Sequence, residues 1–328
     1  MRPAASAPRW VHLLGVAALA ATLSIGNSAW AQAFPSRPLT FSVPWSPGSN
    51  LEILLRALAT EVSQQLGQPV IVDNRPGANQ RLPIMGMQKA APDGHYLANV
   101  SDALVVTQAI ADPTLKFEAG RDYIPVALLV SFPLVLVAHP SLPFHDMKGL
   151  VAYAKANPGK LNLAGGPGSI TQITAERMRQ LGGFSWTFVP YKDTSVAVPD
   201  LLAGRVDLTI TGSLIKPMID TGKLNALATT GPARWSPFPS VPTLRESGLG
   251  MNAAVWYAVV VAPGTPAPVI ARLNEVFNAA LKAPAVVKRI AEYGYTASTL
   301  SPSQFESFIR SEIAAWSPIV KSAGIKMD

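Results

Sequence analysis

The stretch that most constrains the fold is residues 39–58, a strand, a tight turn and a helix in close succession. Leu39, Phe41 and Val43 alternate with polar residues, which predicts a strand with one apolar face. Turn-forming residues fill 44–50, and the leucines that follow recur at helical spacing. With Ser49 or Asn50 as the predicted N-cap, such a junction presents free backbone N–H groups to a small anion. An ordinary strand–helix loop is the alternative interpretation.

The same order of elements continues along the first hundred residues after the turn. Short strands are predicted at 70–72 and 96–100, with a helix between them that ends near Ala91. Strand, helix, strand, helix and strand in this order predict a parallel sheet in an α/β fold. Ligands of such sheets bind beyond the carboxyl ends of the strands, here at loops 44–50, 74–82 and 101–103.

A second α/β unit is predicted further along the chain. A strand at 161–164 leads into the glycine-rich loop 165–169 and then a helix from Thr171. His139–Pro143 follows the apolar run 134–138 and is the expected crossing between the units, and the apolar strand 255–261 is the expected return. The start of the last helix is predicted from Ser301, Pro302 and Gln304. They match an N-cap, a proline at the first helical position and a capping box.

The first 31 residues have the features of a cleaved export signal. Arg2 and Arg9 precede the apolar run 11–25, and Ala29–Ala31 matches a small-residue cleavage site after Ala31. We therefore expect a periplasmic protein. No second long apolar run follows that would span a membrane. The net charge of +7 is scattered without a block of like charges, so nucleic-acid binding is not expected.

Residue types that support catalysis are sparse. The chain has no cysteine, and its four histidines lack metal-ligand spacing, so neither a metal site nor thiol catalysis is predicted. The loop Gly166–Ser169 matches neither a nucleophile elbow nor a phosphate-binding loop, and no cofactor is expected. A non-enzymatic binding protein is the main interpretation. A secreted serine hydrolase using Ser169, and a ligand-sensing adaptor for a receptor, remain as alternatives.

Short motifs in a fixed order then identify a resemblance that covers nearly the whole exported chain. The motifs are Phe34–Pro38, Val43–Gly48, Gly67–Ala78, Ala90–Gly94, His139–Pro143, Val189–Lys192, Asp200–Gly204, Gly222–Leu224, Val241–Thr243 and Ala262–Pro266. They resemble the periplasmic solute-binding proteins of tripartite tricarboxylate transporters, the Bordetella uptake gene (Bug) family.

The resemblance implies a two-domain periplasmic-binding-protein fold of type II-like form, with two lobes joined by two crossings. On this basis, residues 34–138 and 257–328 form lobe 1, and residues 139–256 form lobe 2. It implies capture of a small carboxylate between the lobes. From Trp45 and Arg81 we expect an acid with an aromatic or otherwise apolar body, and we expect the protein to be a monomer. The resemblance also implies delivery of that ligand to the membrane permease subunits of the transporter.

The candidate ligand-binding residues lie in the loops at the strand ends of both lobes. They are Trp45, Ser46, Gly48, Ser49, Asn50, Asn79, Gln80, Arg81, Ser101, Asp102, Gly166, Gly168, Ser169, Thr171, Tyr191, Lys192, Thr211 and Gly212. Several of these loops depart from the family pattern, with Ser49 and Glu52 in the first and Asn79–Pro83 in the second. We expect Arg81 to pair with a ligand carboxylate and Trp45 to form an apolar wall.

Overall fold

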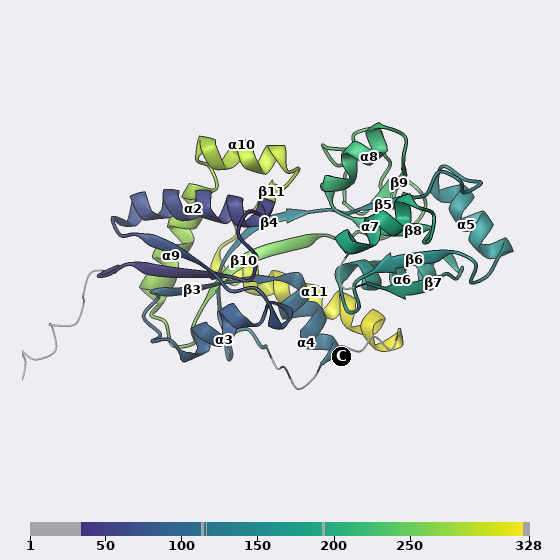
Figure 1. The fold of residues 1–328 in the computed structure, drawn as a ribbon. Helices are drawn as coiled ribbons and strands as arrows, with labels where there is room; N and C mark the ends of the chain where they lie inside the picture. Colours follow the sequence, from purple (N-terminus) through teal and green to yellow (C-terminus); the bar gives the residue numbers. More distant parts are fainter. Residues whose placement is uncertain (1–33, 113–114, 116, 192–193, 324–328) are drawn as a thin grey trace, which may run out of the picture.

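The structure is a computed structural model that describes residues 34–112, 115, 117–191 and 194–323. The predicted export signal, residues 1–31, lies outside the described residues. Two β-sheets, each covered by helices, lie side by side and are connected through the middle of the molecule (Figure 1).

The six-stranded sheet has the order β11-β4-β10-β3-β1-β2. Its strands are β1 (Leu39–Val43), β2 (Val70–Asn74), β3 (Tyr96–Ser101), β4 (Ile124–Phe132), β10 (Val255–Val261) and β11 (Thr296–Ala297). The parallel pairing predicted from the sequence holds for β1 with β2 and with β3. β10 runs antiparallel to both β3 and β4, so the complete sheet is mixed.

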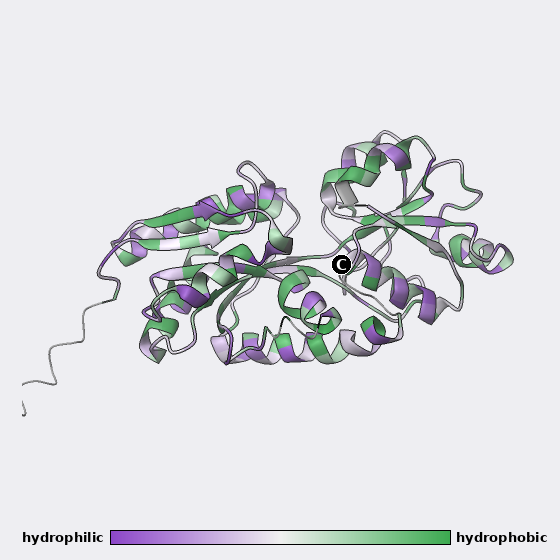
Figure 2. Cartoon of the chain, turned by 60° about the horizontal axis from the view of Figure 1, so that its bottom comes forward, coloured by the Kyte–Doolittle hydropathy of each residue, from purple (hydrophilic) through white to green (hydrophobic). Residues whose placement is uncertain are grey.

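Helices cover both faces of this sheet. The alternating residues of β1 are fully buried on one face, where Phe41 meets Phe277 edge to face. That face packs against α2 (Asn50–Leu66), α9 (Ala267–Ala280) and α10 (Pro284–Glu292). The other face packs against α3 (Leu82–Lys89), η2 (Ala103–Gln108), α4 (Ala109–Ala111) and α11 (Pro302–Ser322), and the short η1 (Ala78–Gln80) precedes α3. Figure 2 shows the apolar strands enclosed between helices that are apolar on one side and polar on the other.

The five-stranded sheet has the order β7-β6-β8-β5-β9. Its strands are β5 (Val135–Ala138), β6 (Asn162–Gly165), β7 (Thr187–Pro190), β8 (Leu208–Thr211) and β9 (Asn225–Thr229). The associated helices are α5 (Met147–Ala156), α6 (Ile170–Gly182), α7 (Thr194–Leu202), η3 (Ser213–Ile215) and α8 (Lys216–Asp220). β6 is parallel to β7 and β8, so their carboxyl ends meet at one edge of the sheet.

The crossing between the sheets lies earlier in the chain than predicted. β5, placed in lobe 1 by the sequence analysis, pairs with β8 and β9 and so belongs to the five-stranded sheet. The chain passes between the sheets at Pro133 and Leu134, which lie between the end of β4 and the start of β5. His139 follows β5, so it is not the crossing. We propose that the lobes divide at Pro133 and at Val255, where β10 begins in the six-stranded sheet.

α11 provides a further connection between the two halves. The predicted capping box at its start is confirmed, because Ser301 accepts from the Gln304 N–H and the Gln304 side chain accepts from the Ser301 N–H. The helix packs against β4 and η2 and then reaches α6, where Gln180 donates to Ser322 at 2.9 Å. Among the helices that the structure describes, none is both long and apolar enough for a membrane span.

Candidate ligand-binding site

A cavity of about 390 Å³ lies between the two sheets, a volume within the range of small-molecule sites. The six-stranded sheet contributes the ends of β1, β3, β4 and β10, and the five-stranded sheet contributes the start of α6 and the end of β8. The lining residues are Trp45, Ser49, Asn50, Leu51, Gln80, Ser101, Asp102, Ala103, Phe132, Leu134, Ser169, Ile170, Thr171, Ile210, Thr211, Gly212, Ser213, Leu214, Val255, Tyr257 and Tyr295. The cavity therefore lies where the ligand loops of both units were expected to meet.

The N-terminus of α6 lacks a side-chain cap. Ser169 has the extended backbone of an N-cap residue, but its hydroxyl donates to the Gly166 carbonyl at 2.6 Å instead of accepting from the helix. Consequently the N–H groups of Ile170, Thr171 and Gln172 have no acceptor within the described part of the chain. Because Ile170 and Thr171 line the cavity, the positive end of this helix is available to an anion there.

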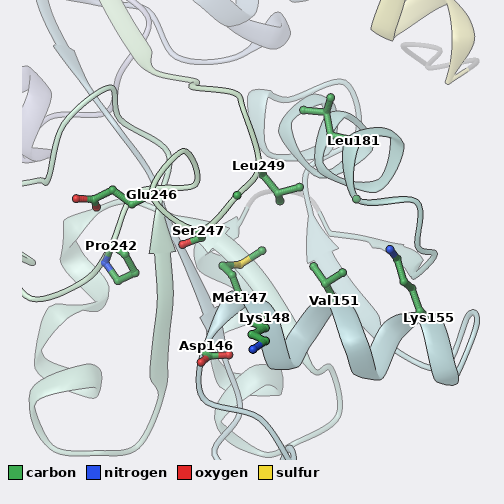
Figure 3. A pocket seen from close by; sticks show the side chains of 12 residues that line it. Asp146, Met147, Lys148, Val151, Lys155, Leu181, Pro242, Glu246, Ser247 and Leu249 are labelled. Atoms are coloured by element: carbon green, nitrogen blue, oxygen red, sulfur yellow. The ribbon is translucent and has the colours of Figure 1, made fainter.

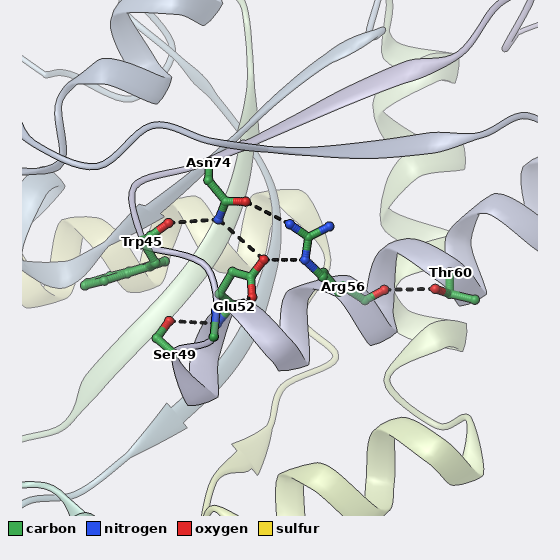
Figure 4. Close-up of polar contacts among 7 residues, drawn as sticks. Trp45, Ser49, Glu52, Arg56, Thr60 and Asn74 are labelled. Atoms are coloured by element: carbon green, nitrogen blue, oxygen red, sulfur yellow. Dashed lines mark hydrogen bonds and ion pairs between the residues drawn. The ribbon is translucent and has the colours of Figure 1, made fainter.

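At the N-terminus of α2, a carboxylate of the protein itself accepts a backbone hydrogen bond. Ser49 accepts from the Glu52 N–H at 3.3 Å, which confirms it as the N-cap, and Glu52 accepts from the Gly48 N–H at 3.1 Å. The Glu52 side chain is almost fully buried and also accepts from Arg56 and Asn74 (Figure 4). The anion expected at this turn is therefore partly replaced by Glu52, although the N–H groups of Asn50 and Leu51 still lack an acceptor among the described residues.

A row of aromatic rings forms one wall of the cavity. Trp45 meets Tyr257 edge to face at 5.5 Å between ring centroids, and Phe132 lies 5.9 Å from Tyr257. Phe132 also stacks on Tyr295 at 4.7 Å. Trp45 is held in place because its indole N–H donates to Asn99 at 3.2 Å. This row offers an apolar, aromatic surface to the body of a ligand.

A polar corner closes the cavity beside this wall. The Ser101 hydroxyl donates to the Gln80 side chain at 2.7 Å, and Gln80 has a left-handed backbone with φ of 68°. Asp102, 3% exposed, accepts from the Trp256 N–H at 3.2 Å. Burial raises the pKa of the Asp102 carboxyl to about 7, the Trp256 N–H lowers it, and the charge of Glu312 raises it.

The structure places ten of the predicted site residues together at the cavity. These are Trp45, Ser49, Asn50, Gln80, Ser101, Asp102, Ser169, Thr171, Thr211 and Gly212. Five others support the surrounding loops without lining it: Ser46, Gly48, Gly166, Gly168 and Tyr191, whose hydroxyl donates to Asp200 at 2.6 Å. Lys192 lies outside the described residues, as does the side chain of Asn79, whose backbone is in η1.

Arg81 does not line this cavity, so its predicted contact with a ligand carboxylate stays a prediction. Its Nε donates to Gln108 at 3.3 Å, and Arg81 is not among the residues that line the cavity. The preceding residue, Gln80, lines it instead. Gln80 has a left-handed backbone, and the two neighbouring side chains have different surroundings. Gln80 lies at the cavity, and Arg81 lies beside Gln108.

Sequence reasoning missed three aromatic residues of the wall, namely Phe132, Tyr257 and Tyr295. Tyr257 had been assigned only to an apolar strand, and no element had been predicted around the other two. Strand pairing supplies the signal that would have located Tyr257. It pairs with Ser101, the last residue of β3, and so lies at the carboxyl end of that strand.

Two features outside this cavity also bring polar groups together. A hollow of about 620 Å³ lies on the five-stranded half between α5 and residues 242–249 (Figure 3). None of the predicted ligand residues lines it, and its walls come from that half alone. The Ser141 hydroxyl lies 2.7 Å from His139 Nδ1, but the Ser141 N–H donates to the same nitrogen at 3.3 Å. This exposed turn therefore gives no support to a hydrolase, and no candidate metal cluster occurs in the described residues.

Comparisons with known proteins identify the family. Residues 54–325 match the model of the tripartite tricarboxylate transporter family receptor. Protein BugT of Bordetella pertussis is 34% identical over 311 residues, covering 94% of this chain and 95% of BugT.

Solved structures agree with this match. The periplasmic binding protein BugD is 27% identical with a TM-score of 0.74, covering 90% of this chain and all of BugD. MatC of Rhodopseudomonas palustris, solved with bound malate, is 29% identical with a TM-score of 0.74, covering 88% of this chain and all of MatC. A second R. palustris protein, solved with adipate, is 30% identical with a TM-score of 0.76, over 89% of this chain and 99% of its own. The chain therefore belongs to the tripartite tricarboxylate transporter receptor family, the Bug family of periplasmic solute-binding proteins.

Proposed function

We propose that this protein captures a small organic acid in the cavity between its two sheets. The observation that carries the proposal is the start of α6, where three N–H groups lack an acceptor within the described residues and two of the residues that bear them line the cavity. Hydrogen bonds from several backbone N–H groups stabilise a carboxylate without a cationic side chain. The described lining includes neither lysine nor arginine, so an anion in the cavity depends on neutral donors, among them these N–H groups.

The body of the acid lies against the aromatic wall of Trp45, Tyr257, Phe132 and Tyr295. Flat or extended apolar groups gain most from such a surface, because burying them removes apolar area from water. Relatives of similar fold bind malate and adipate, which are small carboxylates. These ligands support a small carboxylate as the ligand class. Residues particular to this chain determine which acid it binds.

Delivery to the permease subunits of a tripartite transporter completes the proposal. Its support is membership of the receptor family, together with the export signal predicted in the first 31 residues. In this role the protein collects its ligand in the periplasm, and no chemical step is required of it.

Thermal unfolding of the chain from Gln32 onward, with a panel of small acids, tests the binding proposal. The panel comprises aliphatic diacids, aromatic acids and amino acids, with the matching uncharged amides as controls. A ligand at a hundred times its dissociation constant stabilises the folded state by about 2.7 kcal/mol, which is readily seen as a melting shift. We expect at least one acid to raise the melting temperature and its amide not to. No shift with any acid would refute the proposal.

A further inference from the structure

Two hydrogen bonds cross between the halves of the molecule at the segment that links α10 to β11. The Ser213 hydroxyl, on η3 of the five-stranded half, donates to the Tyr293 carbonyl at 3.1 Å. The indole N–H of Trp235, in the segment between β9 and β10, donates to the next carbonyl along the chain, that of Gly294. Ser213 and Tyr295 both line the cavity, so the two bonds join the halves at its edge.

Gly294 allows the halves to approach closely at this point. Its backbone is left-handed, with φ of 68°, and a Cβ there would lie 2.4 Å from Pro237 Cγ and 3.0 Å from the Trp235 indole nitrogen. Trp235 is 5% exposed and packs into the core of the five-stranded half, 5.3 Å from Phe238 between ring centroids. The five-stranded half therefore fixes the donor, and the half with the six-stranded sheet carries the acceptor.

The halves are joined differently on the side of α11. In Figure 1, α10 lies above the strands that run between the sheets, and α11 lies below them. Trp316 and Ile319 of α11 belong to one apolar core cluster with Ile173 of α6. Parting apolar side chains exposes their surface to water, whereas a hydrogen bond between the halves can be exchanged for one to water. We therefore expect the halves to stay together at α11 and to separate at the two hydrogen bonds.

We propose that the hydrogen bonds donated by Ser213 and Trp235 form a latch, which joins the halves around a bound ligand and breaks when they separate. The segment that the latch holds carries Tyr295, which stacks on Phe132 in the aromatic wall of the cavity. Trp235 does not line the cavity, so it acts on binding through Gly294 and Tyr295. The step that involves a ligand rests on the proposed function, whereas the latch itself does not.

Distances between spin labels test the latch, because the chain has no cysteine and labels attach only at introduced ones. Asp220→Cys and Val287→Cys place one pair at exposed positions of α8 and α10, one label on each half. Leu181→Cys and Lys321→Cys place a second pair on α6 and α11. Electron paramagnetic resonance measures both distances in the protein from Gln32 onward, without any ligand.

Trp235→Phe removes the donor and keeps an aromatic ring. We expect it to raise the population with a longer α8–α10 distance about threefold or more, and to leave the α6–α11 distance unchanged. Trp186→Phe is the matched control, because Trp186 is 7% exposed in the same half and its N–H has no partner among the described residues. The acid with the largest melting shift should bind the Trp235 variant about three- to tenfold more weakly than the Trp186 variant, the effect of losing one hydrogen bond.

Gly294→Ala breaks the latch from the other half, since its Cβ would displace Pro237, and it decides should Trp235→Phe fail to fold. Equal distances or equal affinities in the Trp235 and Trp186 variants would overturn the latch. A change between α6 and α11 in place of α8 and α10 would also overturn it. The distances are measured without a ligand, so they report on the latch even where no acid of the panel binds, an outcome that refutes the proposed function alone.

Discussion

The Glu52 carboxylate accepts a hydrogen bond from the Gly48 N–H four residues earlier, while Ser49 between them accepts from the Glu52 N–H. These reciprocal bonds close the turn between β1 and α2 and fix the position of Trp45 beside it. Asn74 at the end of β2 strengthens the arrangement, because its amide donates to the Trp45 carbonyl at 2.8 Å and also to Glu52. One wall of the cavity is therefore held by an internal carboxylate.

Glu52→Gln should lower the free energy of unfolding by about 1–3 kcal/mol. One end of a glutamine side chain is a donor, so it would face another donor at Gly48 or at Arg56, in a place that water does not reach. The half-exposed Arg56 itself contributes little to the loss. Urea denaturation measures the change, and Glu61→Gln on the same helix is the control, expected to stay within about 0.5 kcal/mol. Equal effects of the two substitutions would contradict the assigned role of Glu52.

Gln80→Ala should weaken ligand binding more than Arg81→Ala. Gln80 lines the cavity and offers an amide to the ligand, whereas Arg81 is bonded to Gln108. We expect a loss of about 1 kcal/mol for Gln80→Ala, the usual contribution of one hydrogen bond, and less than about 0.5 kcal/mol for Arg81→Ala. Titration calorimetry with the same acid on both variants measures the two losses of binding free energy. A larger loss for Arg81→Ala than for Gln80→Ala would support the ligand contact that the sequence predicts for Arg81.

The stability of the ligand-free protein should depend on pH through Asp102. Its pKa is raised by burial from 3.8 to about 7 in the folded state, so the folded protein binds more protons than the unfolded chain between those values. The contribution of Asp102 to the free energy of unfolding is therefore fully present below about pH 4. It is lost as the pH rises to about 7. Asp102→Asn should remove the dependence and be more stable than wild type at pH 8, by about 2–4 kcal/mol.

Urea denaturation of wild type and Asp102→Asn at pH 5 and pH 8 checks this expectation. Glu312, whose pKa burial also raises, is present in both proteins, so the difference between them reports Asp102 together with its interaction with Glu312. A difference in stability that does not change with pH would show that Asp102 stays ionised in the folded protein.

The sequence predicts local structure well where a signal lies within a few residues. The alternation of Leu39, Phe41 and Val43, the Ser49 cap and the Ser301 capping box were all confirmed. Each depends on contacts within one turn or one strand, which periodicity and residue type determine.

Long-range pairing accounts for what sequence reasoning did not find. The nine-residue strand Ile124–Phe132 has antiparallel partners at 255–261 and 296–297, far away in the chain, and was not predicted. The aromatic wall depends on these pairings and was missed with them, apart from Trp45. Arg81 lies outside the cavity lining, next to the left-handed backbone of Gln80, a conformation unusual for a residue other than glycine. Its contact with a ligand carboxylate stays a prediction.

The central claim is that backbone N–H groups at the start of α6 bind the ligand carboxylate. Ile170→Pro removes one of these groups at the first position of the helix, where proline fits the backbone and Ser169 before it is already extended. Ile170→Ala is the control, since it shortens the same side chain and keeps the N–H.

Titration calorimetry compares the two variants with the acid that gives the largest melting shift. The proline variant should bind it at least tenfold more weakly than the alanine variant, because a hydrogen bond to a charged group contributes about 1.5–3 kcal/mol. Equal affinities of Ile170→Pro and Ile170→Ala would contradict a carboxylate at this helix.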